Sequence, residues 1–174
     1  RSRMKEDDSS MPFRNGDFYY YSRYETGKEY PIYARKFAKD GAAEEILLDV
    51  NKMAKGHEYF LVSFPKPSPD HTKIIYSVDD VGRRFYSIYI KDLKTGAILD
   101  APITNTTGNA EWANDNQTIV YSKQHPETLR SQWIYRHKVG ESKDALIFEE
   151  KDETFFVDIS KSRTGRFLFL NSHA

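Results

Sequence analysis

A short pattern that recurs along the chain constrains its fold more than any other feature. In each copy a polar turn is followed by a run of apolar residues that often closes in Tyr-Ser. The four runs end at Ser22, Ser77, Ser122 and Asn171, so consecutive ends lie 55, 45 and 49 residues apart. A period of about 40 to 50 residues is typical of the four-stranded blades of a β-propeller. The sequence therefore predicts an all-β repeat protein.

Each repeat is predicted to contain four short strands. An inner strand precedes the recurring turn and run, and an aromatic strand and then an outer strand follow them. The inner strands are clearest at residues 59–64, 109–113 and 154–159, the aromatic strands at residues 30–35, 85–90 and 133–137, and the outer strands at residues 45–49, 97–99 and 145–149. This order predicts blades over about residues 9–50, 57–101 and 108–150, and the start of a fourth blade at about residues 153–174.

The recurring runs are apolar on both faces of the predicted strands. Residues 18–21 read Phe-Tyr-Tyr-Tyr and residues 167–170 read Phe-Leu-Phe-Leu, without the alternation that a half-exposed sheet requires. Blades stacked face to face would cover both sides of such strands, and aromatic side chains, 14% of the chain, would fill the space between them. A β-sandwich is the alternative, although its strands usually alternate.

Two local features modify this regular picture. A short helix is predicted over residues 51–55, because Asp49 lies near its start and Gly56 just after its end. The second inner strand runs into Pro65, Pro67 and Pro69, and proline lacks the amide donor that a central strand needs. Pairing of that strand is therefore predicted to stop near residue 64 or to survive along one edge.

Charge and composition exclude several classes of protein. The 26 Lys and Arg residues balance 26 Asp and Glu residues, so neither nucleic acid nor an anionic membrane surface is an expected partner. No apolar run is long enough for a membrane-spanning helix, and residues 1–5 lack the apolar segment of a signal peptide. The absence of cysteine excludes disulfides, thiolate metal sites and a cysteine nucleophile, and fits a cytoplasmic protein.

Several segments resemble the propeller of the prolyl oligopeptidase family of serine peptidases, in its oligopeptidase B branch. The segments that carry this resemblance are residues 3–10, 19–25, 27–33, 76–79, 82–84 and 126–130. The resemblance covers essentially the whole chain. It implies about three and a half blades of a seven-bladed propeller, with residues 1–8 as a hinge that leads into it. In that family the propeller caps an α/β-hydrolase domain and admits short peptides, which the oligopeptidase B branch cuts after Lys or Arg.

No catalytic residue, metal site or cofactor site is predicted within the chain. The segment nearest to a Gly-x-Ser-x-Gly nucleophile motif is residues 140–144, which lacks the second glycine and falls in a turn between strands. The five histidines lack the spacing of metal ligands and are expected at turns or on the surface: His57, His71, His125, His137 and His173. The resemblance implies a catalytic Ser, Asp and His downstream of this chain.

Four charged residues are the candidates for functional contacts. Glu111 and Asp158 lie on predicted inner strands and are expected to face the central channel, where a carboxylate attracts a substrate that carries Lys or Arg. The alternative is that both are solvated strand ends or pair with a neighbouring Arg. Arg83 and Arg84 are candidates for contact with the hydrolase domain, and a charged hairpin tip explains them equally well. Trp112, in the opposite strand phase from Glu111, is expected in the core.

The resulting hypothesis is a non-catalytic propeller segment that gates access to a peptidase and selects substrates by size. Its expected partners are the downstream hydrolase domain and short basic peptides. Exposed blade faces would also favour self-association. The alternative is a stand-alone propeller module that binds a protein partner.

Overall fold

The computed structural model describes residues 9–174, so the predicted hinge at residues 1–8 lies outside the described residues. The described chain consists of strands β1 to β14 and one helix of four residues, α1. It divides into a first unit, residues 9–57, and a second unit, residues 58–174. No helix in the described part of the chain is long and apolar enough to cross a membrane. The all-β fold predicted from the repeats is confirmed.

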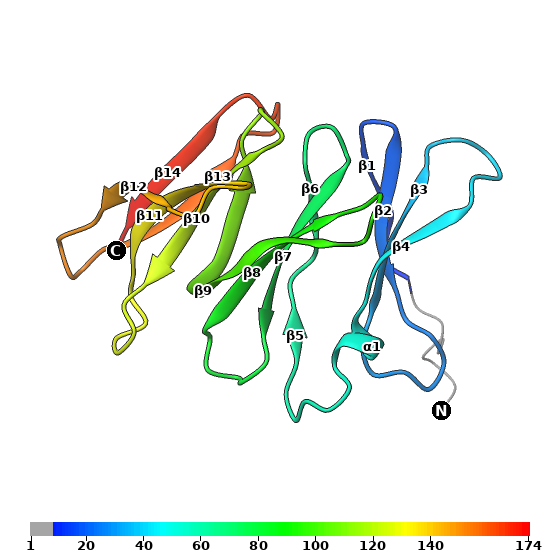
Figure 1. The fold of residues 1–174 in the computed structure, drawn as a ribbon, viewed down its shortest axis with the longest axis horizontal. Coiled ribbons are helices and arrows are strands. Elements are labelled where there is room, and N and C mark those ends of the chain that lie inside the picture. The colour runs from blue at the N-terminus through cyan, green and yellow to red at the C-terminus, as the bar shows by residue number, and fades with distance from the viewer. Residues whose placement is uncertain (1–8) are drawn as a thin grey trace. The chain divides into compact units, whose positions relative to one another are not determined.

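The first unit is one antiparallel sheet in the order β1-β2-β3-β4 (Figure 1). Its strands are β1 Phe13–Asn15, β2 Phe18–Arg23, β3 Ile32–Phe37 and β4 Glu44–Asp49. Gly16, with φ 59°, occupies the tight turn between β1 and β2, where a residue with a side chain would be strained. This sheet has the four strands expected of one blade.

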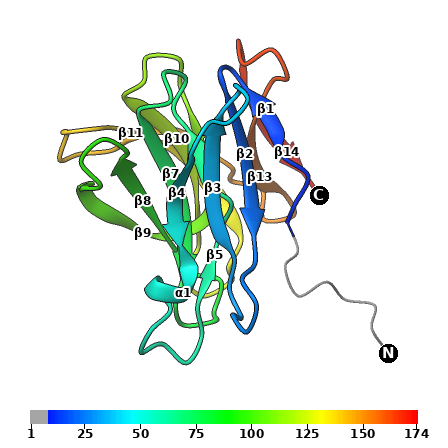
Figure 2. The same cartoon turned by 90° about the vertical axis from the view of Figure 1, so that its right-hand side faces the viewer.

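The predicted helix is confirmed at the end of β4, one residue earlier than expected. The α1 helix spans Val50–Met53 (Figure 2). The side chain of Asp49 caps it by accepting a hydrogen bond from the Lys52 amide. Val50 is buried, and it anchors the helix to the core of the first unit. The helix forms the chain's exit from the first sheet.

The second unit contains the remaining ten strands. They are β5 Leu61–Val62, β6 Lys66–Pro67, β7 Lys73–Asp79, β8 Tyr86–Asp92, β9 Ile98–Trp112, β10 Thr118–Gln124, β11 Ser131–Lys138, β12 Ala145–Glu149, β13 Phe156–Lys161 and β14 Leu168–His173. Strands β5 and β7 to β12 follow one another in a single antiparallel sheet, β6 pairs with β7, and β13 and β14 form a separate pair.

The proline-rich segment interrupts the second inner strand as predicted. Strands β5 and β6 both pair with β7, and they are separated by residues 63–65. Pro67 lies opposite Ile74 in the register. The inner edge of this blade is therefore made of two short pieces rather than one strand.

Strand β9 corrects the prediction of two separate short strands at residues 97–99 and 109–113. It is one strand of 15 residues, whose first part pairs with β8 and whose second part pairs with β10. Thr106 marks the changeover, because it lies opposite both Tyr86 and Lys123. Gly108 has φ 85°, and a Cβ atom there would meet the Tyr86 ring at 2.9 Å. Bulges and this glycine let the strand bend from one blade into the next without breaking.

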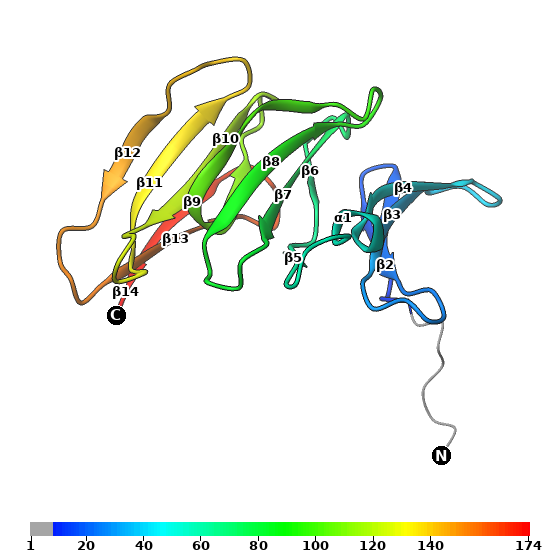
Figure 3. The ribbon, with the colours of Figure 1, turned by 60° about the horizontal axis from the view of Figure 1, so that its bottom comes forward.

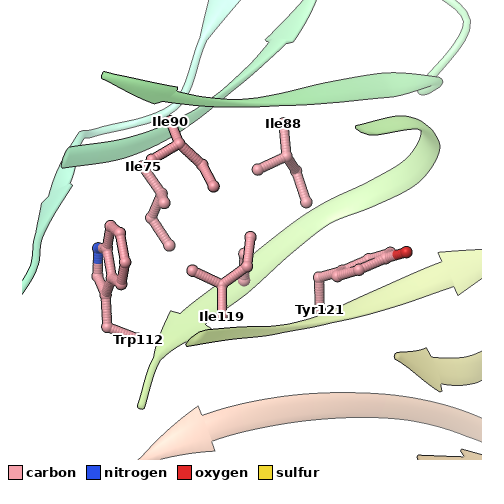
Figure 4. Close-up of a cluster of buried hydrophobic side chains, with 7 residues drawn as sticks. Ile75, Ile88, Ile90, Trp112, Ile119 and Tyr121 are labelled. Atoms are coloured by element: carbon pink, nitrogen blue, oxygen red, sulfur yellow. The ribbon is translucent and has the colours of Figure 1, made fainter. Parts of the chain in front are cut away.

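The core of the second unit lies between β7 and β8 on one side and β9 and β10 on the other (Figure 4). Its buried members are Ile75, Ile88, Ile90, Ala110, Trp112, Ile119 and Tyr121. Trp112 is 2% exposed, which confirms its expected place in the core. Every residue of β7 from Ile74 to Asp79 is buried, so this run is covered on both faces as predicted.

Strands β13 and β14 form a third layer of the second unit, after β7–β8 and β9–β12. They cover the face of the β9–β12 blade that is turned away from β7 and β8 (Figure 3). Val157 and Ile159 of β13 pack with Ile134 of β11. Three stacked layers agree with the blade arrangement and not with a two-sheet sandwich. The apolar run at residues 167–170 is not covered on both faces as predicted, because Phe167 and Phe169 are 59% and 51% exposed. Within residues 9–174, no strand covers the outer side of β14.

Candidate functional site

Glu111 lies on the second part of β9, next to the inner strand of the preceding blade. Its carboxylate accepts a hydrogen bond of 2.6 Å from the ammonium group of Lys66 on β6. The same ammonium group also donates to the backbone carbonyl of Ala110, over 2.9 Å. The side chain of Glu111 is 17% exposed, so it is neither a solvated strand end nor the partner of an arginine. It joins the inner edges of two consecutive blades.

Lys161 places a second cation near the same carboxylate. It lies at the end of β13, and its Nζ donates to the Trp112 carbonyl over 2.7 Å. Burial lowers the pKa of Lys161, and the charge of Glu111 acts in the opposite direction. Two lysines therefore accompany one carboxylate, and the three groups carry a net positive charge. This arrangement offsets the attraction that Glu111 alone would exert on a cationic peptide.

Asp158 lies on β13, directly opposite Asn171 of β14. Its Oδ1 accepts a hydrogen bond of 2.7 Å from the Asn171 side chain, and its Oδ2 lies 3.6 Å from Nδ1 of His173. The Asp158 side chain is 43% exposed, whereas its neighbours Val157 and Ile159 point into the core. No interaction among the described residues brings Asp158 together with Glu111.

Arg83 and Arg84 lie in the turn between β7 and β8, which a buried carboxylate organises. Asp79 accepts hydrogen bonds from the backbone amides of three turn residues: Val81, Gly82 and Arg84. Arg84 has φ 61°, and its carbonyl accepts a hydrogen bond from the side chain of Gln124. Both arginines are exposed, and neither forms an ion pair with a residue the structure describes. The backbone of the β7–β8 turn is thus held in place, while the guanidinium groups of Arg83 and Arg84 are exposed and can contact another molecule or domain.

Sequence reasoning missed a buried cluster around His137. This residue was expected at a turn or on the surface, but it lies on β11 with a side chain that is 6% exposed. Nδ1 lies 2.7 Å from Oδ1 of Asp144, and Nε2 lies 3.1 Å from Oδ2 of Asp100. Tyr121 also donates a hydrogen bond to Asp144, and burial together with that carboxylate raises the pKa of Tyr121. The sequence places His137 at the end of a predicted strand, residues 133–137, but its carboxylate partners come from other segments.

The His137 cluster is not a catalytic dyad. Both ring nitrogens lie within hydrogen-bond distance of carboxylate oxygens, Nδ1 beside Asp144 and Nε2 beside Asp100. Ser142 lines a hollow of about 490 Å³ together with His137. Because both ring nitrogens are directed at carboxylates and neither at the Ser142 hydroxyl, His137 lacks the geometry of a general base for that hydroxyl. In residues 9–174 no group of three or more His, Cys, Asp or Glu is placed to hold a metal ion.

Comparisons with known proteins define the class to which these blades belong. The family model described as "Prolyl oligopeptidase, N-terminal beta-propeller domain" matches residues 1–174. The chain belongs to this family and corresponds to the N-terminal part of its propeller.

Individual proteins show what the chain is similar to within this family. The chain is 38% identical to Protease 2 of Moraxella lacunata and 37% identical to dipeptidyl aminopeptidase BI of Pseudoxanthomonas mexicana, in each case over 98% of this chain and 26% of the relative. Among solved structures, oligopeptidase B from Leishmania major matches with a TM-score of 0.92 and 32% identity, over 98% of this chain and 25% of that one. The chain thus spans about a quarter of the length of these relatives.

Proposed function

We propose that this chain serves an oligopeptidase B-like serine peptidase that cleaves short peptides after Lys or Arg. Its own contribution is non-catalytic: the propeller limits access by size and docks on a downstream α/β-hydrolase domain that supplies the Ser, Asp and His. The observation that carries this proposal is the 0.92 TM-score with oligopeptidase B at 32% identity. His137 directs both ring nitrogens at carboxylates and neither at Ser142, and this supports the non-catalytic role. We further propose a cytoplasmic location. We also propose blades at about residues 9–50, 57–101 and 108–150, with a fourth blade that begins at about residues 153–174.

The candidate residues have separate proposed roles. Arg83 and Arg84 would contact the hydrolase domain, which their exposure at an ordered turn supports. Glu111 and Asp158 would face the substrate path, and the higher exposure of Asp158 makes it the better candidate for direct contact with a basic peptide. A charge that is already paired with Lys66 contributes less to attraction of a cation.

Cleavage assays on the intact protein test the specificity. Peptides that differ only in the residue before the scissile bond should show kcat/KM values at least about 100-fold higher for Lys or Arg than for Leu, because a site built for a charge rejects its neutral analogue. A preference for Pro would contradict the proposal. The name of the Pseudoxanthomonas relative makes dipeptide release the second activity to measure. Stepwise release of dipeptides without regard to Lys or Arg would favour that activity instead.

The size selection and the non-catalytic role need their own assays. A short basic peptide should be cleaved much faster than the same sequence inside a folded protein. Equal rates would contradict gating. Residues 1–174 alone, shown to be folded by circular dichroism, should not cleave the short peptide. Activity of this segment that is lost on Ser142→Ala would overturn the assignment, and binding of a protein partner without peptidase activity in the intact protein would favour the stand-alone module.

A further inference from the structure

A hollow of about 240 Å³ lies between the β9–β10 turn and the β13–β14 turn. Ala113, Phe167 and Leu168 line it with apolar surface, and Lys161 and Arg166 line it with positive charge. Trp112 borders the hollow through its backbone carbonyl, to which Lys161 donates, because its ring is buried in the core. A hydrogen bond of 2.9 Å from the Asn114 side chain to the Gly165 carbonyl ties the two turns together. Both turns belong to the second unit, so this hollow is a feature of two consecutive blades.

The two cations at this hollow have no carboxylate partner. The Lys161 ammonium group uses one donor on the Trp112 carbonyl, and no carboxylate oxygen of residues 9–174 lies within 4 Å of it. The Arg166 guanidinium lies 6.0 Å from the centre of the Phe167 ring and also lacks an ion pair with any described residue. The charge of Glu111 acts on Lys161 from a distance, but the ion-pair partner of Glu111 is Lys66. Partial burial of an unpaired ammonium group is unfavourable, and a bound anion would relieve it.

The neighbouring blade junction shows that unpaired lysines are not a general property of the repeat. There the inner-strand lysine, Lys66, has its own carboxylate at 2.6 Å. The turn of that junction is closed by a hydrogen bond from the Asp70 amide to the side chain of Asn116. The junction at Lys161 combines an open hollow, apolar walls and two cations without a carboxylate partner, and together these features favour an anionic ligand with an apolar part.

We propose that this hollow binds a small organic carboxylate, with its apolar group against Phe167 and Leu168 and its charge beside Lys161 and Arg166. The volume is below the range of about 300 to 1,000 Å³ that drug-sized ligands occupy, so it accommodates a group of the size of one residue. Two sources share this chemistry: a free carboxylic acid, and the C-terminal residue of a short peptide. Only the second source rests on the proposed function.

Isothermal titration calorimetry on the intact protein tests the site with a matched pair of ligands. N-acetylphenylalanine carries the carboxylate, and its C-terminal amide has the same apolar group without the charge. The acid should bind at least about tenfold more tightly than the amide, since charge-assisted hydrogen bonds are roughly twice as strong as neutral ones. Its affinity should fall as salt is raised. Equal affinity of acid and amide, or no binding of the acid at millimolar concentration, would overturn the proposal.

Variants locate the binding on the protein. Lys161→Met combined with Arg166→Gln should weaken binding of the acid about tenfold or more and leave the amide unchanged. Arg163→Gln is the control, because this exposed arginine lies in the same turn and does not line the hollow. Unchanged binding in the double variant, or an equal loss in the control, would refute the site.

A third ligand separates the two sources. Gly-Gly-Phe with a free C-terminus should bind like the acid if the site accepts peptide ends, and its failure to bind would restrict the site to free acids. These measurements record binding and not turnover, and none of the ligands contains Lys or Arg. A failure of the proposed cleavage specificity would therefore not change the binding result. A failure to bind these ligands would likewise leave the proposed cleavage specificity untouched.

Discussion

The two blade junctions of the second unit use the same strand in different ways. At the Lys66 junction, the indole nitrogen of Trp112 donates to the Lys66 carbonyl over 2.9 Å, and the Lys66 side chain pairs with Glu111. At the Lys161 junction, the Asn109 side chain bonds both backbone groups of Ile159, and Lys161 binds only a carbonyl. The repeat thus fixes where the strands lie, while individual side chains decide whether a junction is closed by an ion pair or has a hollow beside cations that no carboxylate pairs.

The largest expected effect is on the Lys66 junction, through Trp112→Ala. Removing this buried ring should lower the free energy of unfolding by about 3 to 5 kcal/mol, because a cavity forms in the core and the bond to Lys66 is lost. Denaturant titration of the intact protein measures this change. Trp133→Ala is the matched control, since that indole is only partly buried and donates to Glu149 near the outer edge. An equal cost for both variants would show that the junction does not depend on Trp112.

The next effect is on the Lys161 junction, through Asn109→Ala. The substitution leaves the amide and carbonyl of Ile159, a residue that is 4% exposed, without their partner, which should cost about 1 to 3 kcal/mol of unfolding free energy. Asn114→Ala removes one exposed bond between the same two blades and should cost clearly less. Hydrogen exchange of the Ile159 amide provides a local readout. Unchanged protection in Asn109→Ala would contradict this role of the side chain.

A smaller effect is expected for the ion pair itself. Glu111→Gln should reduce the unfolding free energy by about 1 kcal/mol or less, because the Lys66 side chain is 44% exposed and water screens the pair. A double-mutant cycle with Lys66→Met isolates the coupling between the two charges. The coupling should shrink at 1 M salt. A coupling that is zero at low salt would mean that the Lys66 junction is held by Trp112 and backbone contacts alone.

The smallest effect concerns the pH dependence of the Lys161 junction. Burial lowers the pKa of Lys161 from its ordinary 10.5, so the unfolded chain retains this proton to a higher pH than the folded chain. Stability should therefore rise with pH between the lowered value and 10.5, when the contribution of this residue is considered alone. Lys161→Met should remove that rise, which appears as the difference between the melting-temperature profiles of the two proteins. Lys66→Met is the comparison at the other junction. Identical profiles for the parent protein and Lys161→Met would contradict the effect.

Much of the fold could be predicted because the relevant signals are local. Asp49 caps a helix by accepting from the amide three residues later. Pairing with β7 is interrupted at residues 63–65, a segment that includes Pro65. The apolar run in β7 required cover on both faces, and the structure supplies it. The continuity of β9 was missed because its turn-like residues, among them Gly108, act as a bend within a strand that changes partners.

The candidate site was harder to predict because it depends on partners distant in sequence. Glu111 was identified from its place on an inner strand, yet its partner Lys66 lies 45 residues earlier. His137 looked like a surface residue, and its two carboxylates come from residues 37 positions before it and 7 after it. No periodic sequence pattern predicts these contacts between distant side chains, since they depend on how the blades stack.

The sequence by itself determined the repeat and the order of strands within it, because turn chemistry and side-chain periodicity act over a few residues. The family followed from the resemblance of particular segments, such as residues 19–25, to known propellers. The tertiary structure alone decided which charges meet. Stacking brought Glu111 to Lys66, enclosed His137 between two carboxylates and left Lys161 and Arg166 beside an open hollow. The physical reason is that charge interactions depend on distance in space and on burial, and both are settled only when one blade lies against the next.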